Sequence, residues 1–117
     1  MSIERIEAGP LMSQAVVHGG VAYLSGVVAA DFDADVADQT SSVLAKIDEL
    51  LARAGTDKSR LLKANIWLAD IATFKEMNDV WTSWVVPGAT PARATVEAPM
   101  ARPNIKVEIM VEAAVDS

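Results

Sequence analysis

The chain has 117 residues, a formal net charge of −6, 51% hydrophobic and 22% charged residues, one histidine and no cysteine. This length suits a single domain, which we assign to residues 1–117. The lack of cysteine excludes disulfides, thiolate metal sites and cysteine nucleophiles, and one histidine, His18, cannot form a histidine cluster for zinc. Lysines and arginines are scattered singly, so the clustered cations that bind nucleic-acid phosphates are absent.

The same features limit the cellular location and the binding partners that we expect for the protein. Charged residues begin at Glu4, and no stretch approaches ~20 uninterrupted apolar residues, so we expect neither a signal peptide nor a membrane span. The negative charge also argues against an anionic membrane as a partner. We therefore expect a cytoplasmic protein with no nucleic-acid or membrane partner. The high hydrophobic fraction further predicts that another copy of the chain covers part of the apolar surface.

The first half of the chain predicts three strands and a helix. A short strand covers residues 3–6, and two apolar strands, over residues 14–18 and 21–28, flank the turn signal His18-Gly19-Gly20. An acidic loop leads to a helix over residues 36–54, which Asp35 caps and Gly55 ends. Its apolar stripe has the spacing of one helical face and consists of Val36, Thr40, Val43, Leu44, Ile47, Leu50 and Leu51.

The second half predicts a strand, a helix and two further strands. Residues 61–68 alternate, with one face formed by Leu62, Ala64, Ile66 and Leu68. Thr73 and Glu76 have the spacing of a capping box that opens a second helix, which ends at Pro87-Gly88. The apolar stripe of this helix is Met77, Val80, Trp81 and Trp84. Strands over residues 92–98 and 106–115 close the chain.

The order of elements predicts an α+β fold of two layers, in which both helices lie on one face of a mixed sheet. The other face of the sheet would then be open. Strand alternation assigns to it four residues that are too apolar or too small for an ordinary solvated surface: Trp67, Thr95, Met110 and Ala114. Coverage of this face by other subunits resolves the conflict.

Two charged residues on this second face are the main candidates for chemistry. Alternation places Arg93 and Glu108 on it together, so neighbouring strands would give one cleft with a cation and a carboxylate. A guanidinium binds a carboxylate through two parallel hydrogen bonds, and a nearby carboxylate can hold a water and move protons. The alternative interpretation is an interface salt bridge from Arg93 to Glu108, Glu97 or Glu112.

Several other polar residues have simpler explanations. His18 is expected in an exposed turn rather than as a proton shuttle. Ser25 has no triad context, so a hydrogen bond to a ligand or to the backbone is the better interpretation, and Gly26 allows close backbone approach or a bulge. Trp81 and Trp84 are expected to pack in the core. An aspartate group lacks the glycine and glutamate of a calcium-binding loop and is interpreted as a solvated loop with a helix cap: Asp31, Asp33, Asp35 and Asp38.

Several motifs together resemble the RidA/YjgF family. The specific ones are Pro-Ala-Arg-Ala-Thr-Val-Glu at residues 91–97 and Lys-Val-Glu-Ile at residues 106–109. Weaker matches are Gly9-Pro10 followed by Ser-Gln-Ala-Val at residues 13–16, Leu24-Ser25-Gly26, and Phe74 with Asn78 four residues later. In order and spacing, the matches cover nearly the whole chain.

This resemblance implies a homotrimer with a chorismate-mutase-like fold and clefts between its subunits. It also implies hydrolysis of 2-aminoacrylate-type enamines, or of their imine tautomers, to a 2-oxo acid and ammonia, without a cofactor or a metal. The arginine of the family, which binds the substrate carboxylate, falls on Arg93, and its water-polarising glutamate falls on Glu108. Further substrate contacts fall near Thr95 and on Ser25 and Gly26.

One departure from the family pattern bears on the substrate. Many members carry tyrosine just before Ser-Gln-Ala-Val, where this chain has Met12, preceded by Leu11. A more apolar pocket edge favours larger imino acids. A rival function is a non-enzymatic trimer that binds a small carboxylate metabolite, which would keep Arg93 without needing Glu108. Ribonuclease activity, sometimes attached to this family, fits poorly with the net charge of −6.

Overall fold

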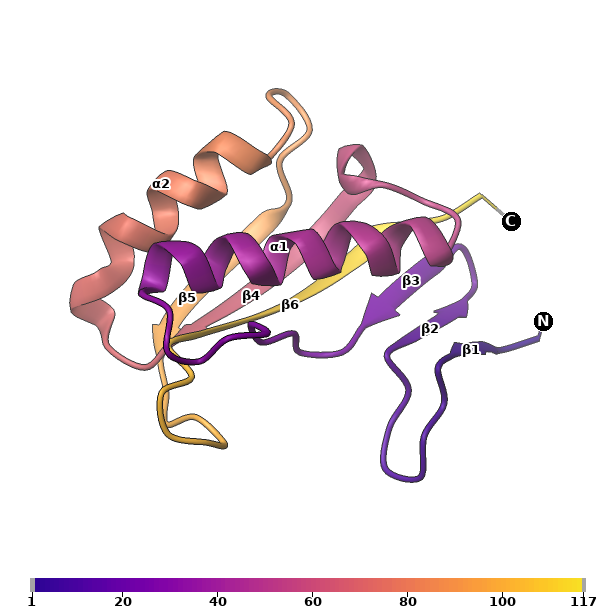
Figure 1. Cartoon of the computed structure of the whole chain (residues 1–117). Helices are drawn as coiled ribbons and strands as arrows, with labels where there is room; N and C mark the ends of the chain where they lie inside the picture. Colours follow the sequence, from indigo (N-terminus) through magenta and orange to yellow (C-terminus); the bar gives the residue numbers. More distant parts are fainter. Residues whose placement is uncertain (1, 117) are drawn as a thin grey trace.

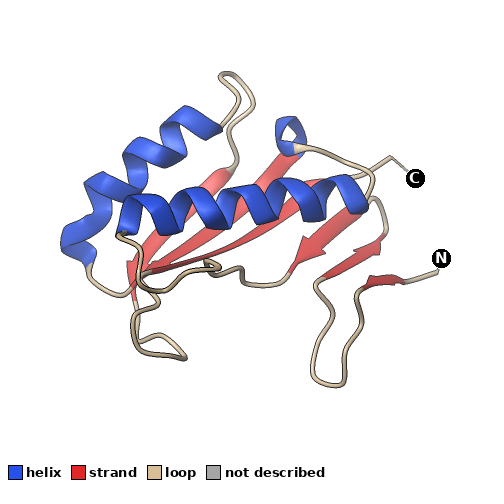
Figure 2. Ribbon diagram, viewed as in Figure 1, coloured by secondary structure: helices blue, strands red, loops and turns tan. Residues whose placement is uncertain are grey.

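Two helices lie on one face of a six-stranded sheet in the computed structural model of the chain, which describes residues 2–116 (Figure 1; Figure 2). The strand order is β1-β2-β3-β6-β4-β5, where β4 and β5 are parallel and every other neighbouring pair is antiparallel. The predicted two-layer α+β fold with a mixed sheet is therefore confirmed. No helix in residues 2–116 is long and apolar enough to cross a membrane.

The elements follow the predicted order. They are β1 (Glu4–Ile6), β2 (Ala15–His18), β3 (Val21–Leu24), α1 (Val36–Arg53), β4 (Leu61–Leu68), α2 (Phe74–Trp84), β5 (Ala92–Glu97) and β6 (Val107–Ala114). Two short 3-10 helices precede β4 and α2, namely η1 (Lys58–Arg60) and η2 (Ile71–Thr73).

Helix α1 forms as its sequence predicts. The Asp35 carboxylate accepts a hydrogen bond of 2.8 Å from the backbone N–H of Asp38, which satisfies one of the free donors at the helix start. At the other end Gly55 has φ +85°, a conformation that side chains with a Cβ rarely adopt. The predicted stripe is buried against the sheet, and Val43, Ile47 and Leu51 have no solvent exposure.

Three local predictions are wrong. Leu62 is 48% exposed, because a register shift between Leu61 and Lys63 places Leu61 in the core instead. Thr73 does not cap α2, since η2 precedes the helix and the Thr73 hydroxyl donates to the backbone oxygen of Asp70. The third predicted strand ends at Leu24 rather than at residue 28, with only an isolated bridge from Val27 to Ile109 beyond it.

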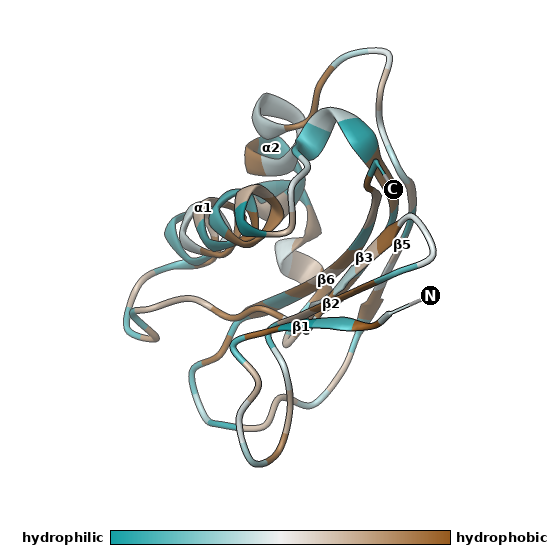
Figure 3. Ribbon diagram, turned by 90° about the vertical axis from the view of Figure 1, so that its right-hand side faces the viewer, coloured by the Kyte–Doolittle hydropathy of each residue, from teal (hydrophilic) through white to brown (hydrophobic). Residues whose placement is uncertain are grey.

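No helix or loop of residues 2–116 covers the face of the sheet that points away from the helices, as the edge-on view in Figure 3 shows. Paired residues on neighbouring strands point to the same side of a sheet. Trp67 pairs with Glu108, and Asn65 pairs with Met110, so these residues share the open face, opposite the buried Ile66 and Ile109. The predicted faces of β4 and β6 are therefore confirmed, apart from Leu62.

The predicted faces of β5 are reversed. Arg93 pairs with Ala64 and Thr95 with Ile66, whose side chains point to the helices, so Arg93 and Thr95 lie on the helix side. Alternation separated the two faces correctly, but the apolar face was assumed to point inward. The strand is at the edge of the sheet and beside α2, and its small apolar residues line the open face: Ala92, Ala94 and Val96.

Candidate functional site

Arg93 lies against one stripe of helix α2. Phe74, Asn78 and Trp81 are spaced by four and three residues, which brings them to the same side of the helix. An Nη1 donor of Arg93 gives a hydrogen bond of 2.6 Å to the Asn78 Oδ1. The guanidinium carbon lies 5.6 Å from the ring centre of Phe74 and 5.5 Å from that of Trp81, within the range of cation–π attraction.

These contacts leave the charge of Arg93 uncompensated. Within residues 2–116 the guanidinium forms no ion pair. Burial lowers the pKa of Arg93, but an arginine side chain remains protonated in proteins. Asn78 accepts from one of the five N–H donors of the Arg93 guanidinium, so the other donors of this planar group remain for an anion. The arrangement is suited to binding a carboxylate.

The other polar side chains on this side of β5 are Thr95 and Glu97. The Glu97 Oε1 accepts a hydrogen bond of 2.9 Å from the backbone N–H of Ile71, so it serves η2 and does not pair with Arg93. The Oγ1 of Thr95 is buried without a hydrogen-bond partner among the described residues. Buried hydroxyls normally have a hydrogen-bond partner, so the Thr95 hydroxyl still has its hydrogen-bonding capacity unused.

Glu108 lies beside a glycine that makes room for it. The chain bends after β3, and the backbone of Val27 then rejoins β6 through two hydrogen bonds with Ile109, of 2.8 and 3.1 Å. The bend brings Gly26 against the Glu108 side chain so closely that a methyl group at Gly26 would overlap its carboxylate. The predicted close approach at Gly26 is thus confirmed.

Ser25 is held next to this carboxylate site by Gln14. Its backbone N–H donates to the backbone oxygen of Gln14 at 2.9 Å, and its hydroxyl lies 3.4 Å from the Gln14 Oε1. The Ser25 hydroxyl therefore bonds to a side chain and not to the backbone, and its bond to a ligand stays a prediction. Gln14 belongs to the Ser-Gln-Ala-Val motif at residues 13–16, which sequence analysis treated only as a family marker.

Arg93 and Glu108 do not share a cleft within one chain, contrary to the prediction from alternation. Arg93 lies on the helix side of β5 and Glu108 on the open face of β6, with β4 between the two strands. A salt bridge within the chain from Arg93 to Glu108 or Glu112 is excluded for the same reason. A site that uses both residues must take them from different copies of the chain.

The remaining candidates behave as expected. His18 is exposed at the end of β2, where its Nδ1 lies 3.1 Å from the backbone oxygen of Ser2. Trp81 is buried and packs 5.4 Å from Trp84, between ring centres. The aspartates of the acidic loop form local turns and the helix cap.

The strand order and the two helices on one face define a two-layer α+β domain whose edge strand carries an unpaired arginine. The family model described as Endoribonuclease L-PSP matches residues 2–115. A RutC family protein from Haemophilus ducreyi is 44% identical over 114 residues, covering 97% of both chains. These matches show that the chain belongs to the family that its motifs resemble, the RidA/YjgF family.

Two further comparisons support this assignment, and the solved structure among them also agrees in fold and in length. The crystal structure of a YjgF family member from Neisseria meningitidis has a TM-score of 0.96 and 44% identity, covering 100% of this chain and 98% of that one. The chloroplastic Reactive Intermediate Deaminase A of Arabidopsis thaliana is 36% identical over 103 residues, which are 83% of this chain and 54% of that protein.

Proposed function

We propose that the protein is a hydrolytic deaminase of enamine or imine acids, either of the 2-aminoacrylate type or larger imino acids, which releases a 2-oxo acid and ammonia. The unpaired guanidinium of Arg93 carries the proposal, because it is fixed by Asn78 and two aromatic rings and presents its free donors to an anion. The deaminase named among the relatives supports the reaction type.

The proposed site lies between subunits of a homotrimer. The open face of the sheet supports this assembly, because Tyr23 is 44% and Val96 50% exposed on it. Further apolar residues share the face: Val16, Val21, Trp67, Ala92, Ala94, Met110 and Ala114. Arg93 on the helix side of one subunit and Glu108 on the open face of the next subunit then meet at the boundary.

In the proposed mechanism Arg93 binds the substrate carboxylate and fixes the 2-carbon beside Glu108. The enamine first tautomerises to an imine. Glu108 takes a proton from water as the water oxygen bonds to the imine carbon, and the C=N electron pair moves to nitrogen. The proton then passes to that nitrogen, which gives a carbinolamine. Its hydroxyl proton next moves through Glu108 to the nitrogen while the C=O bond forms and the C–N bond breaks, and ammonia and the 2-oxo acid leave.

The other residues of the site serve as substrate contacts in this proposal. Gly26 gives the substrate access to the backbone beside Glu108, and Ser25 fixes the bend that holds Gly26 in place. Thr95 supplies a buried hydroxyl that is free to bond with the substrate or with the adjacent subunit. The scheme uses no metal and no cofactor.

The test is competition for imines that an amino-acid oxidase generates in solution. Imines hydrolyse spontaneously, so the readout is how far the protein suppresses trapping by semicarbazide while it increases the yield of 2-oxo acid. Arg93→Lys keeps the charge but loses the planar fork, and we expect kcat/KM to fall at least ~10-fold.

Arg60→Lys is the matched control, because within residues 2–116 the Arg60 side chain makes only an exposed ion pair with Asp116, and the rate of this variant should be unchanged. If wild-type protein leaves trapping unaffected for every imine tested yet still binds 2-oxo acids, the protein is a binding module and not a deaminase.

A further inference from the structure

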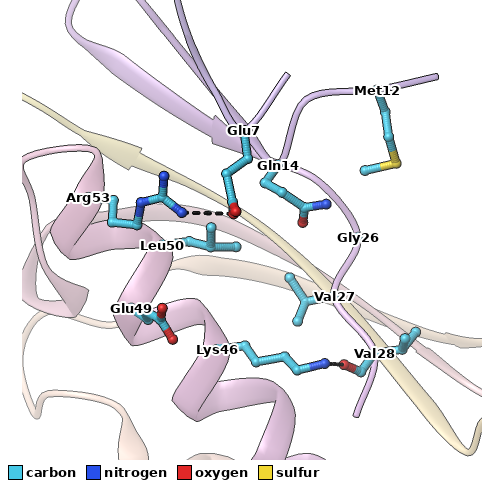
Figure 4. A pocket seen from close by; sticks show the side chains of 10 residues that line it. All are labelled: Glu7, Met12, Gln14, Gly26, Val27, Val28, Lys46, Glu49, Leu50 and Arg53. Atoms are coloured by element: carbon cyan, nitrogen blue, oxygen red, sulfur yellow. Dashed lines mark hydrogen bonds and ion pairs between the residues drawn. The ribbon is translucent and has the colours of Figure 1, made fainter. Parts of the chain in front are cut away.

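A pocket of about 430 Å³ lies on the α1 side of the segment that carries Gly26 (Figure 4). Its walls are the second half of α1, the turn between β1 and β2, and the chain that follows β3. The lining residues used below are Glu7, Met12, Val27, Lys46, Glu49 and Leu50. Neither Arg93 nor Glu108 lines it, although Gly26, which the proposed catalytic site also uses, forms part of its wall.

The floor of the pocket is apolar. Val27 is 6% and Leu50 8% exposed, and Met12, which is 49% exposed, stands on the opposite wall. The volume lies within the range of about 300–1,000 Å³ that is typical of small-molecule sites. It suits a compact ligand with an apolar part of a few carbon atoms.

The rim of the pocket carries balanced charge. Lys46 donates one hydrogen bond of 2.8 Å to the backbone oxygen of Val28, which leaves two of its three N–H groups for a ligand. Glu49 is exposed and forms no ion pair within the described residues, whereas Arg53 is paired with Glu7 at 2.7 Å. Two cations and two carboxylates together favour a ligand that carries one charge of each sign.

Lys46 and Glu49 have the spacing that such a ligand needs. They are three residues apart on α1, so their side chains start from the same side of the helix, one turn apart. Figure 4 shows both beside Leu50, with the Arg53–Glu7 pair at one end of the pocket and the Lys46–Val28 contact at the other. The two unlike charges of the ligand must therefore lie close together.

The wall opposite α1 is held in an unfavourable backbone conformation. Glu7 has φ +49°, a region that residues other than glycine rarely occupy. The conformation aims the Glu7 carboxylate at Arg53, and the turn is closed by a hydrogen bond of 2.8 Å from the backbone N–H of Gly9 to the backbone oxygen of Met12. The ion pair and the backbone bond therefore hold this wall of the pocket in a fixed shape.

We infer that this pocket binds a free α-amino acid with an aliphatic or thioether side chain. Its carboxylate contacts Lys46, its ammonium group contacts Glu49, and its side chain lies between Leu50, Val27 and Met12. An α-amino acid carries both charges on one carbon, as the spacing of Lys46 and Glu49 requires. This inference does not depend on the proposed deaminase activity.

The test uses the native assembly labelled with ¹³C at the methionine methyl groups and titrated with leucine. The Met12 resonance, assigned with Met12→Leu, is expected to shift in a saturable way with a Kd of about 1 mM or below, which corresponds to at least about 4 kcal/mol. Leucinamide lacks the carboxylate and N-acetylleucine lacks the ammonium group, so each is expected to bind at least about tenfold more weakly.

Two variants and one control separate the site from a non-specific effect. Lys46→Met and Glu49→Gln are each expected to weaken leucine binding at least about tenfold. Lys75→Met is the matched control on α2, where Lys75 is exposed and paired with Asp79, and it should bind as wild type does. If Lys46→Met does not fold without its contact to Val28, the exposed Glu49→Gln carries the test.

Three results would overturn the inference. The first is a Met12 resonance that no amino acid shifts, as happens if another subunit fills the pocket. The second is an equal response to leucine and its singly charged derivatives, and the third is unchanged binding in Glu49→Gln.

Discussion

Mixing two inactive variants should restore activity, if each site takes Arg93 from one subunit and Glu108 from its neighbour. Arg93→Ala removes the substrate anchor. Glu108→Gln keeps the size of the side chain but cannot carry a proton, which typically costs 10²-fold or more. Each variant alone should therefore form an intact but nearly inactive trimer, because the two residues lie on opposite faces of the sheet and neither is in the core.

The expected recovery follows from counting subunits. In a hybrid trimer a site is complete when a Glu108→Gln subunit supplies Arg93 and an Arg93→Ala subunit supplies Glu108. With equal amounts and random assembly, about one site in four meets this condition, so activity should rise to about a quarter of wild type. It should be greatest at equal mixing and fall as either variant is taken in excess.

The assay is imine hydrolysis after the two variants are unfolded and refolded together. The control is the same two proteins refolded separately and then combined, which should remain inactive unless subunits exchange. If mass spectrometry shows hybrid trimers and activity does not recover, the division of the site between subunits is wrong.

Three further outcomes follow from the structure. Gly26 does not have a positive φ, so Gly26→Ala is resisted only by the Glu108 carboxylate, and we expect kcat to fall at least about tenfold with little loss of thermal stability. Thr95→Val removes a buried hydroxyl that has no partner among residues 2–116, so Tm should hold or rise while KM for imines increases several-fold. Light scattering at micromolar concentration should give the mass of a trimer, and a stable monomer would remove the shared site.

The elements that could be predicted are those set by local patterns. Helix α1 has its own start signal in Asp35, its own stop signal in Gly55 and a complete apolar stripe between them, so its bounds were predicted to within one residue. The start of α2 directly after Thr73 was predicted, but the capping bond was not formed, because η2 comes first and the Thr73 hydroxyl is already used within η2.

Long-range packing explains why the faces of β5 were not predicted. Alternation groups Arg93 with Thr95 and Glu97, but it does not tell which group faces the helices. An arginine on the inward side looked costly, yet Asn78 and the rings of Phe74 and Trp81 accept it there. Because those residues belong to α2, no pattern within residues 92–98 could show that the inner side of this edge strand suits a cation.

The two halves of the proposed site are therefore built by different contacts, and the fold keeps them apart. Arg93 depends on the stripe of α2, whereas Glu108 depends on the bend at Gly26, which removes a side chain where the carboxylate lies. A single chain that brought them together would neutralise both charges in an ion pair and leave no fork for a substrate. Separation on opposite faces avoids this pairing in the isolated subunit. Assembly can then bring the two groups to a spacing that leaves room for a carboxylate and a water between them.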